Sequence, residues 1–481
     1  MPTKVHHASD RIDPAIWKIS SVAVLGSFLS QLDATVVNVS LSSLAAELNS
    51  SLSTIQWVTS GYLLALALML PLNGWLVDRI GAKALYLWCF SAFTLSSALC
   101  GLAWSASSLI GFRVLQGMSG GLLAPMAQMM IARAAGKRLA SVFGIAAIPI
   151  LLAPLLGPVT AGAILQFASW RWLFLVNLPV GALALTLAIF FLPNDRAETN
   201  PRDLDLFGLA LLSPGLVLFL YASDHIRDRD GFVILAASML LLFASFKWAT
   251  KQEEKAIIDL RLFKRKAFSA SAMTLFMTNG ISFCGQMLIP VFLIRVAGRS
   301  PSATGLLLAP LGLGMMCGYP FVGTFVKRFG IRTVSAGGAL LALTGTLPLV
   351  YLASHGLVIP ILGFALFIRG LGLSCVGVPS ISAAYSSVRR EDLPMATTAL
   401  NIVMRIGGPT LTTVCATFLG WRLGLAQTPA AVQGAFTAAF LLLCTFHAAL
   451  VAAAMRLPQW VEGTNEPPHA SESVTLASVS E

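Results

Sequence analysis

Long apolar stretches, separated by short polar ones, recur along the whole of this chain of 481 residues. Each stretch is about 20 residues long, which is the length that an α-helix needs to cross the hydrocarbon core of a bilayer. Several contain Pro or Gly, which membrane helices tolerate because neighbouring groups satisfy the freed backbone. The pattern therefore predicts an all-α integral membrane protein surrounded by a lipid bilayer.

We predict about fourteen spans from these stretches. Their ranges are 17–40, 54–75, 84–104, 107–132, 140–166, 171–192, 204–222, 231–249, 268–294, 302–326, 333–353, 357–384, 393–420 and 432–456.

The composition excludes a soluble globular protein. Hydrophobic residues make up 56% of the chain and charged residues 11%, whereas about a quarter of a soluble domain is charged. The seven cysteines lie almost all within apolar stretches. Because they lack the spacing of metal ligands, we interpret them as small packing residues and predict no metal site.

Lys and Arg gather in alternate loops between the spans. With an even number of spans and both termini in the cytoplasm, these loops are cytoplasmic, as the positive-inside rule requires. Membrane topology thus accounts for the net charge of +11 and disfavours a nucleic-acid partner. The basic loop residues include Arg79, Lys83, Arg133, Lys137, Arg138, Lys327, Arg328, Arg332, Arg389 and Arg390.

One loop sequence occurs twice. "GWLVDRIGAK" at 74–83 and "GTFVKRFGIR" at 323–332 share the pattern G-x-[LF]-V-x-R-x-G-x-[KR], each in a cytoplasmic loop. Two similar halves in the same orientation are typical of parallel-repeat transporters, whose substrate path lies between the halves. We therefore divide the chain into a cytoplasmic leader 1–16, a six-helix bundle 17–200, an inserted helix pair 201–250, a cytoplasmic basic linker 251–266, a second six-helix bundle 267–458 and a disordered cytoplasmic tail 459–481.

Asp33, in "SQLDATVVNV", is the one acidic residue that we place well inside the hydrocarbon. A carboxylate there costs several kcal/mol unless it is neutralised, paired or hydrated. Asp33 lies roughly 10 Å from the outer end of its span, and Arg113 lies at a similar depth in the fourth span. Exclusion of water favours the protonated acid and a nearby arginine favours the carboxylate, so Asp33 suits proton loading and release. The alternative is an ion pair that only fixes helix packing.

Two further arginines, Arg369 and Arg405, fall near mid-membrane beside glycines. Backbone carbonyls or cavity water would be their partners, and a substrate-facing role stays open. Polar and aromatic residues inside apolar spans are candidates for lining the substrate cavity together with Asp33, although each could equally be a packing or interhelical hydrogen-bonding residue. These candidates are Trp57, Tyr62, Gln116, Asn279, Gln286 and Asn401.

Several motifs occur in a fixed order along the spans. "LDATVVNVSL" contains Asp33, "IQWVTSGYLLA" contains Trp57, and "GFRVLQGMSGG" contains Arg113; "APLLGPVTAG" and "WRWLFLVNLPVG" follow. Together with the repeated loop, they resemble the fourteen-helix drug:proton antiporter family of the major facilitator superfamily, the multidrug exporters of the EmrB/QacA type. The likeness runs through most of the N-terminal half and recurs in the C-terminal half.

The resemblance implies an inner-membrane carrier that works by alternating access between two six-helix bundles. It would exchange protons for amphipathic organic compounds expelled from the cell, driven by the proton gradient without a cofactor. Asp33 would carry the proton and Arg113 would support its transfer. The repeated loop would latch the cytoplasmic gate through Gly74, Asp78, Arg79, Gly81, Lys83 and Arg328.

The fifth-span motif of this family is G-x-x-x-G-P-x-x-G-G. Gly157, Pro158 and Gly162 match it, whereas Ala153 and Ala161 replace glycines. The match implies a kinked helix that packs tightly against the other half and seals the cavity.

Two other function classes were weighed. A proton symporter of the same fold would import a nutrient or organic acid, and the antiporter-like motif speaks against it. A membrane-embedded enzyme is disfavoured because paired carboxylates and metal-ligand clusters are missing from the sequence. The sequence leaves open the substrate and whether a periplasmic adaptor and an outer-membrane channel take part.

Overall fold

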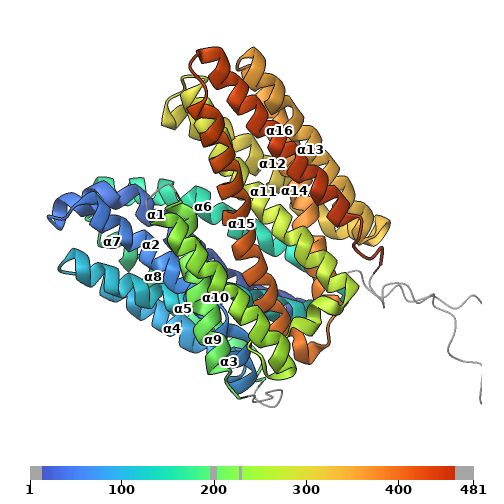
Figure 1. The fold of residues 1–481 in the computed structure, drawn as a ribbon. Helices are drawn as coiled ribbons and strands as arrows, with labels where there is room; N and C mark the ends of the chain where they lie inside the picture. Colours follow the sequence, from blue (N-terminus) through green and yellow to red (C-terminus); the bar gives the residue numbers. More distant parts are fainter. Residues whose placement is uncertain (1–12, 196–202, 227–229, 461–481) are drawn as a thin grey trace, which may run out of the picture.

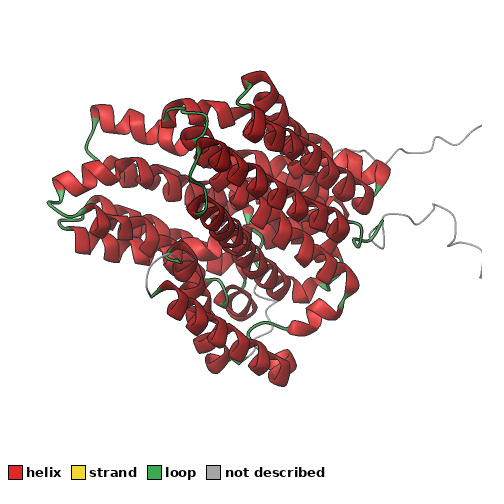
Figure 2. Cartoon of the chain, turned by 45° about the horizontal axis from the view of Figure 1, so that its top comes forward, coloured by secondary structure: helices red, strands yellow, loops and turns green. Residues whose placement is uncertain are grey.

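A computed structural model describes residues 13–195, 203–226 and 230–460. Across these ranges the chain is helical and forms no strand (Figures 1 and 2). The first bundle consists of α1 (Pro14–Glu47), α2 (Leu52–Met69), α3 (Leu72–Ile80), α4 (Ala82–Gly101), α5 (Ala106–Ala135), η1 (Gly136–Arg138), α6 (Leu139–Phe167), α7 (Trp172–Leu175) and α8 (Asn177–Phe191). The inserted part consists of α9 (Leu206–Asp224), α10 (Gly231–Gln252), η3 (Glu253–Lys255) and η4 (Leu260–Lys264). The second bundle consists of α11 (Lys266–Arg295), α12 (Pro301–Phe329), α13 (Ile331–His355), α14 (Ile359–Ser386), η5 (Arg390–Asp392), α15 (Leu393–Gly424) and α16 (Pro429–Ala454).

The helices confirm an all-α membrane architecture of about fourteen spans. Among the described residues, 12 helical segments are long and apolar enough to cross a membrane. Helices α5 and α6, with 30 and 29 residues, have the length to do the same. The predicted tail falls mostly on residues outside those described, so its predicted disorder is not assessed by the structure.

Two predicted spans are each divided into two helices. The second predicted span divides into α2 and α3 at Leu70 and Pro71. Proline has no N–H to continue the helix, and its ring displaces the carbonyl four residues earlier. The sixth predicted span divides into α7 and α8 at Val176.

The two bundles use the same helix pairings, which gives the sequence repeat its structural meaning. In the first bundle α1 packs on α6, α5 and α8, while α5 also packs on α2 and α4. In the second, α11 packs on α15, α14 and α16, while α14 also packs on α12 and α13. The two loop copies also share a backbone conformation, with φ of +83° at Gly81 and +81° at Gly330. Glycine adopts such angles without the steric cost that a Cβ brings.

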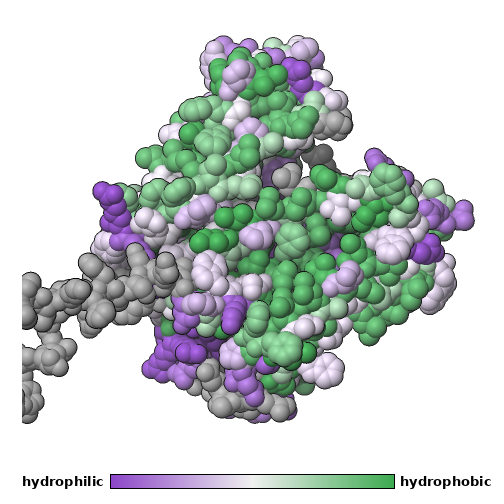
Figure 3. Space-filling view, turned by 180° about the vertical axis from the view of Figure 1, so that it is seen from behind, coloured by the Kyte–Doolittle hydropathy of each residue, from purple (hydrophilic) through white to green (hydrophobic). Residues whose placement is uncertain are grey.

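The bundles meet at one end of the molecule. We call it the basic end, because it carries Arg79, Lys83, Arg328 and Arg389. There α3 packs on α15 and α6 packs on α12. In Figure 1 the two bundles diverge away from this contact, and Figure 3 shows two lobes with broad apolar surfaces and the largest group of hydrophilic residues at the lower left.

Hydrogen bonds across the bundles reinforce the contact at the basic end. Asn73 Nδ2 donates to Thr398 Oγ1 at 3.2 Å. Gln128 Oε1 accepts from Tyr385 Oη at 3.0 Å and from Asn401 Nδ2 at 2.9 Å. Such bonds are worth most where water is excluded, so they favour a closed basic end.

The inserted pair lies beside the junction of the bundles. Helix α9 packs on α10, on α2 and on α15, so it touches both bundles. Ser213 Oγ on α9 donates to the carbonyl of Leu68 at 2.9 Å. The pair is therefore a lateral addition and leaves the symmetric helix pairings intact.

Candidate functional site

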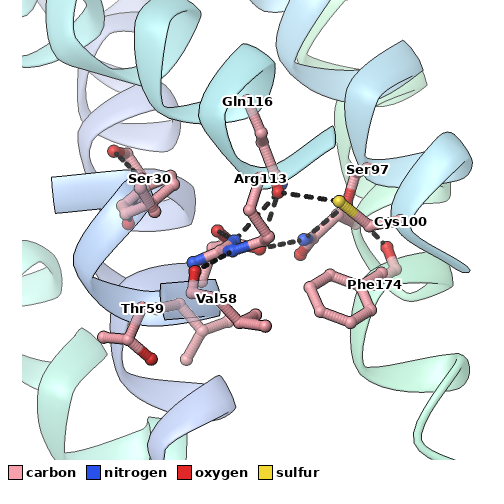
Figure 4. Close-up of polar contacts among 12 residues, drawn as sticks. Ser30, Val58, Thr59, Ser97, Cys100, Arg113, Gln116 and Phe174 are labelled. Carbon is pink, nitrogen blue, oxygen red and sulfur yellow. Dashed lines mark hydrogen bonds and ion pairs between the residues drawn. The ribbon is translucent and has the colours of Figure 1, made fainter. Parts of the chain in front are cut away.

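Asp33 is buried inside the first bundle, with 2% of its surface exposed. Its Oδ2 accepts a hydrogen bond from Arg113 Nη1 in an ion pair. Its Oδ1 accepts from Asn177 Nδ2 at 2.9 Å and from Gln116 Nε2 at 3.1 Å. Three donors from α5 and α8 thus converge on one carboxylate of α1 (Figure 4). The predicted proximity of Asp33 and Arg113 is confirmed.

Arg113 is fully buried and makes contacts with several helices. Its Nε donates to the carbonyl of Val58 at 3.2 Å, and its Nη1 also donates to Gln116 Oε1 at 2.8 Å. The guanidinium lies 4.1 Å from the ring centroid of Tyr62 and 5.7 Å from that of Phe174. Cation–π contacts of this kind are strongest in desolvated sites. The fold therefore holds the arginine in one place.

Glycines on α5 explain how Arg113 reaches α2. A Cβ at Gly117 would clash with the carbonyl of Tyr62, and a Cβ at Gly121 would clash with the carbonyl of Leu66. Small residues spaced by four let two membrane helices approach closely. The motif "GFRVLQGMSGG" thus supplies both the charged residue and the close packing that positions it.

A second layer of polar groups orients the donors. Ser97 Oγ accepts from Asn177 Nδ2 at 3.0 Å and donates to the carbonyl of Phe174 at 2.9 Å. Cys100 Sγ donates to Gln116 Oε1 at 3.6 Å. Tyr62 Oη donates to the carbonyl of Ser30 at 3.2 Å. Because each donor has a second partner, the amides keep the orientation that the carboxylate needs.

The contacts of Asp33 balance the charge of its carboxylate. As a carboxylate, Asp33 is neutralised by Arg113 and satisfied by two amides. As a neutral acid, it would lose the attraction of Arg113 but would also be relieved of the cost of a buried charge.

The other predicted cavity residues lie elsewhere. Trp57 is 43% exposed and stacks on Tyr221 of the inserted pair, with ring centroids 6.1 Å apart. Asn401 belongs to the contact between the bundles through Gln128. Asn279 donates to the carbonyl of Leu275 on its own helix at 3.4 Å, and Gln286 is exposed on α11. Of the predicted cavity residues, the structure brings Tyr62 and Gln116 to Asp33.

The two remaining arginines differ in their surroundings. Arg369 is buried in the second bundle, where Nη2 donates to the carbonyl of Ile281 at 3.1 Å. Its guanidinium lies against Gly285, where any side chain would clash with it. Arg405 is half-buried on α15. Within the described ranges, no acidic group lies within ion-pair distance of either arginine.

The repeated loops lie at the basic end as expected. Gly74 packs on α15, where a Cβ would come within 3.2 Å of the Pro394 carbonyl and Thr398 Oγ1. Asp78 is buried beside it on α3. Arg79 and Arg328 are exposed, and each guanidinium lies 5.3 Å from an aromatic ring of its own helix.

Lys83 and Gly81 form part of a separate network around Asp195. The Asp195 carboxylate accepts from the backbone N–H of Ala82 at 2.7 Å and of Lys83 at 3.2 Å. It also pairs with Arg133 at 3.4 Å. Lys83 Nζ donates to the carbonyl of Leu192 at 2.7 Å. A carboxylate at the start of α4 matches the positive end of the helix dipole and ties α4, α5 and the end of α8 together.

The fifth-span motif does not contact the other bundle where we expected it to. A Cβ at Gly157 would clash with Thr35 of α1, in the same bundle, and a Cβ at Gly162 would point into open space. Contact of α6 with the second bundle occurs at Gly144, against the carbonyl of Tyr319. The side chain of Pro158 lies outside the described part. Gly157 therefore allows α6 to pack closely on α1 at Thr35, which lies two residues after Asp33.

Sequence analysis did not single out several residues of the site. Asn177 donates to Asp33, and Asn73, Gln128 and Tyr385 join the bundles. Asn177 and Gln128 are polar residues in apolar helices, which is the signal that could have identified them. Their partners on other helices are at least 80 residues away in sequence, so their roles depend on the tertiary fold.

Comparison with known proteins agrees with this architecture. A family model described as "Major Facilitator Superfamily" matches residues 23–412. "Multidrug resistance protein B homolog" of Mycobacterium tuberculosis is 33% identical over 421 residues, covering 86% of this chain and 78% of that protein. "Putative multidrug resistance protein MdtD" of Cronobacter sakazakii is 32% identical over 312 residues, covering 62% of this chain and 64% of that protein.

A solved structure shares the fold. The proton:xylose symporter XylE superimposes with a TM-score of 0.61 at 14% identity, covering 91% of this chain and 96% of that one. At this identity the likeness concerns the fold alone. The match of the family model across most of the chain and the extended similarity to the mycobacterial relative carry the assignment, and the chain belongs to the major facilitator superfamily.

Proposed function

We propose that this protein is a proton-coupled efflux transporter that exchanges protons for amphipathic organic compounds. The relatives named as multidrug resistance proteins support the direction of transport. The observation that carries the proton coupling is the buried Asp33, held by Arg113, Gln116 and Asn177. Ionisable residues inside membrane spans are rare and usually mark a functional site, and this one has a dedicated arginine and two amides around it.

Asp33 would take up a proton from the outer side and release it to the cytoplasm. Arg113 would set how readily the proton leaves, because its positive charge favours the carboxylate. Asn177 and Gln116 would keep the carboxylate oriented toward Arg113 in both protonation states. No cofactor would be required, since the proton gradient supplies the free energy.

Alternating access would come from rocking of the two bundles around the site between them. We assign the basic end to the cytoplasm, on the positive-inside rule. The contacts of Asn73, Gln128 and Gly74 with the second bundle then form a closed cytoplasmic gate. Opening that gate would require these hydrogen bonds to break as the opposite side closes.

The proposed setting is the inner membrane, with both termini in the cytoplasm and the domain division given above. A small organic compound and protons would be the transported species. A periplasmic adaptor and an outer-membrane channel would be partners only if the exported compound must also cross an outer membrane.

Everted membrane vesicles, acidified inside by respiration, test the direction of transport. A panel of fluorescent amphipaths, including rhodamine 6G and pyrenebutyrate, would be followed with wild type and with Asp33→Asn. An antiporter accumulates its substrate in the vesicle lumen, and nigericin together with valinomycin in potassium buffer, which removes both the pH gradient and the membrane potential, abolishes this accumulation. A symporter would carry the substrate out of the lumen together with protons, and that result would contradict the proposed exchange.

A further inference from the structure

One face of α15 points toward the first bundle. Pro394, Thr398 and Asn401 contact Gly74, Asn73 and Gln128 respectively. Their spacing of four and then three residues places them on one stripe of the helix. The next position on this stripe is Arg405, four residues beyond Asn401 and therefore about 6 Å further from the basic end.

Arg405 therefore lies beyond the closed contact, on the side of that contact that faces away from the basic end. It is half-buried and lies on the face of α15 that contacts the first bundle. It has no hydrogen-bond or ion-pair partner within the described ranges. A guanidinium at this depth is costly without a counter-charge, so an unpaired one facing the partner bundle indicates a ligand.

The other two buried arginines are less available to a ligand between the bundles. Arg113 is neutralised by Asp33, although its Nη2 has no hydrogen-bond partner. Arg369 lies inside the second bundle against Gly285. The positive charge that a molecule between the bundles would meet is therefore that of Arg405.

We propose that the transported compound carries an anionic group, a carboxylate or sulfonate, that binds Arg405 between the bundles. A guanidinium presents paired N–H donors that match the two oxygens of such a group. This inference rests on the proposed function and names the substrate class for the same cavity. Proton and substrate then bind different groups, so the change of conformation, rather than competition for Asp33, has to enforce exchange.

The charge movement follows from the substrate class. Entry of one proton and exit of one monoanion both move positive charge inward, so each cycle transfers two charges. Membrane potential would therefore drive export as well as the pH gradient does.

Binding to the full-length protein in lipid nanodiscs tests the inference without a gradient or a direction of transport. Three probes of the same skeleton would be compared by equilibrium dialysis against empty discs: pyrenebutyrate, the neutral pyrenebutanamide and the cationic pyrenebutyl-trimethylammonium. We expect the anion to bind about ten-fold more tightly than the amide, the scale of a charge-assisted hydrogen bond.

Two variants then localise the preference. Arg405→Gln is expected to bind the anion and the amide about equally, and Arg405→Lys to keep most of the preference. Size-exclusion profiles and thermal unfolding show that both variants are folded. Equal binding of the three probes to wild type, including no binding of any, overturns the inference, as does an anion preference that survives in Arg405→Gln. Failure of antiport in everted vesicles would leave these binding ratios unchanged, so the two proposals can fail separately.

Discussion

Each bundle buries one arginine on its fourth span, and the two arginines have opposite surroundings. Arg113 on α5 faces the carboxylate of Asp33 and the donors that orient it. Arg369 on α14 faces the carbonyl of Ile281 and the backbone of Gly285 on α11, the helix that corresponds to α1. The two bundles thus share the helix pairings and a buried arginine, while among the described residues the arginine of the first bundle alone has a carboxylate as its partner.

This difference suggests separate roles for the two bundles in the transport cycle. On the proposed function, the first bundle, whose buried arginine faces a carboxylate, would bind the proton, whereas Arg369, which donates to a carbonyl, would stay charged. The second bundle would be the counterpart whose α15 closes the basic end and, on the further inference, presents Arg405 to the transported compound.

Replacing Arg113 by methionine breaks this comparison with the largest effect. Arg113→Met leaves Asp33 as a buried charge without its partner, which costs about 3–5 kcal/mol of unfolding free energy. We expect transport to be lost and thermal stability to fall sharply. The double variant Asp33→Asn with Arg113→Met should regain most of the stability and none of the proton coupling. Thermal unfolding in detergent and transport by everted vesicles would measure these two outcomes.

Asn177→Leu removes one donor to Asp33 and leaves the ion pair in place. A hydrogen bond to a charged group is worth roughly 1.5–3 kcal/mol, so the exchange rate should fall about ten-fold or more. Initial rates in proteoliposomes at a fixed pH gradient would show it. A variant with the wild-type rate would mean that the amide does not orient the carboxylate during the cycle.

Gly157 and Gly162 offer a matched pair within one motif. Gly157→Val places a side chain against Thr35 and should destabilise the protein by about 1–3 kcal/mol through overpacking. Gly162→Val meets open space and should change stability little. Partial rescue of Gly157→Val by Thr35→Ala would show that the contact within the first bundle is responsible, because the threonine hydroxyl and methyl would be gone.

Arg369→Met is expected to have the smallest effect. Arg369 has no carboxylate to abandon, so the exchange for a side chain of similar length should change stability by less than about 1.5 kcal/mol. Proton-coupled transport should persist at half the wild-type rate or more. Loss of coupling in this variant would show that the second bundle takes part in proton movement.

The sequence predicted the parts of this molecule that depend on local pattern. Apolar runs predicted the spans. Asp33 and Arg113 were recognisable because a charged side chain inside a membrane span is energetically costly, whatever its partner, and is therefore rare. Helix pairing was needed to find Asn177 and Gln128, since an isolated amide in an apolar helix does not reveal its partner. Gly157 was assigned to the wrong contact because a glycine indicates close packing without indicating which neighbour approaches. The face of α15 that turns toward the first bundle could be identified only from the contacts of Thr398 and Asn401 in the structure, and Arg405 lies on this face.

Infrared difference spectroscopy of the reconstituted protein tests the central claim most directly, because it detects the proton without a substrate. Spectra would be recorded between about pH 4 and pH 9 for wild type, Asp33→Asn and Arg369→Met. The account predicts a carbonyl stretch from a protonated, buried carboxyl group that disappears as the pH rises. This band should be absent in Asp33→Asn and unchanged in Arg369→Met. A band that persists without Asp33 would assign the proton to another group and contradict the account.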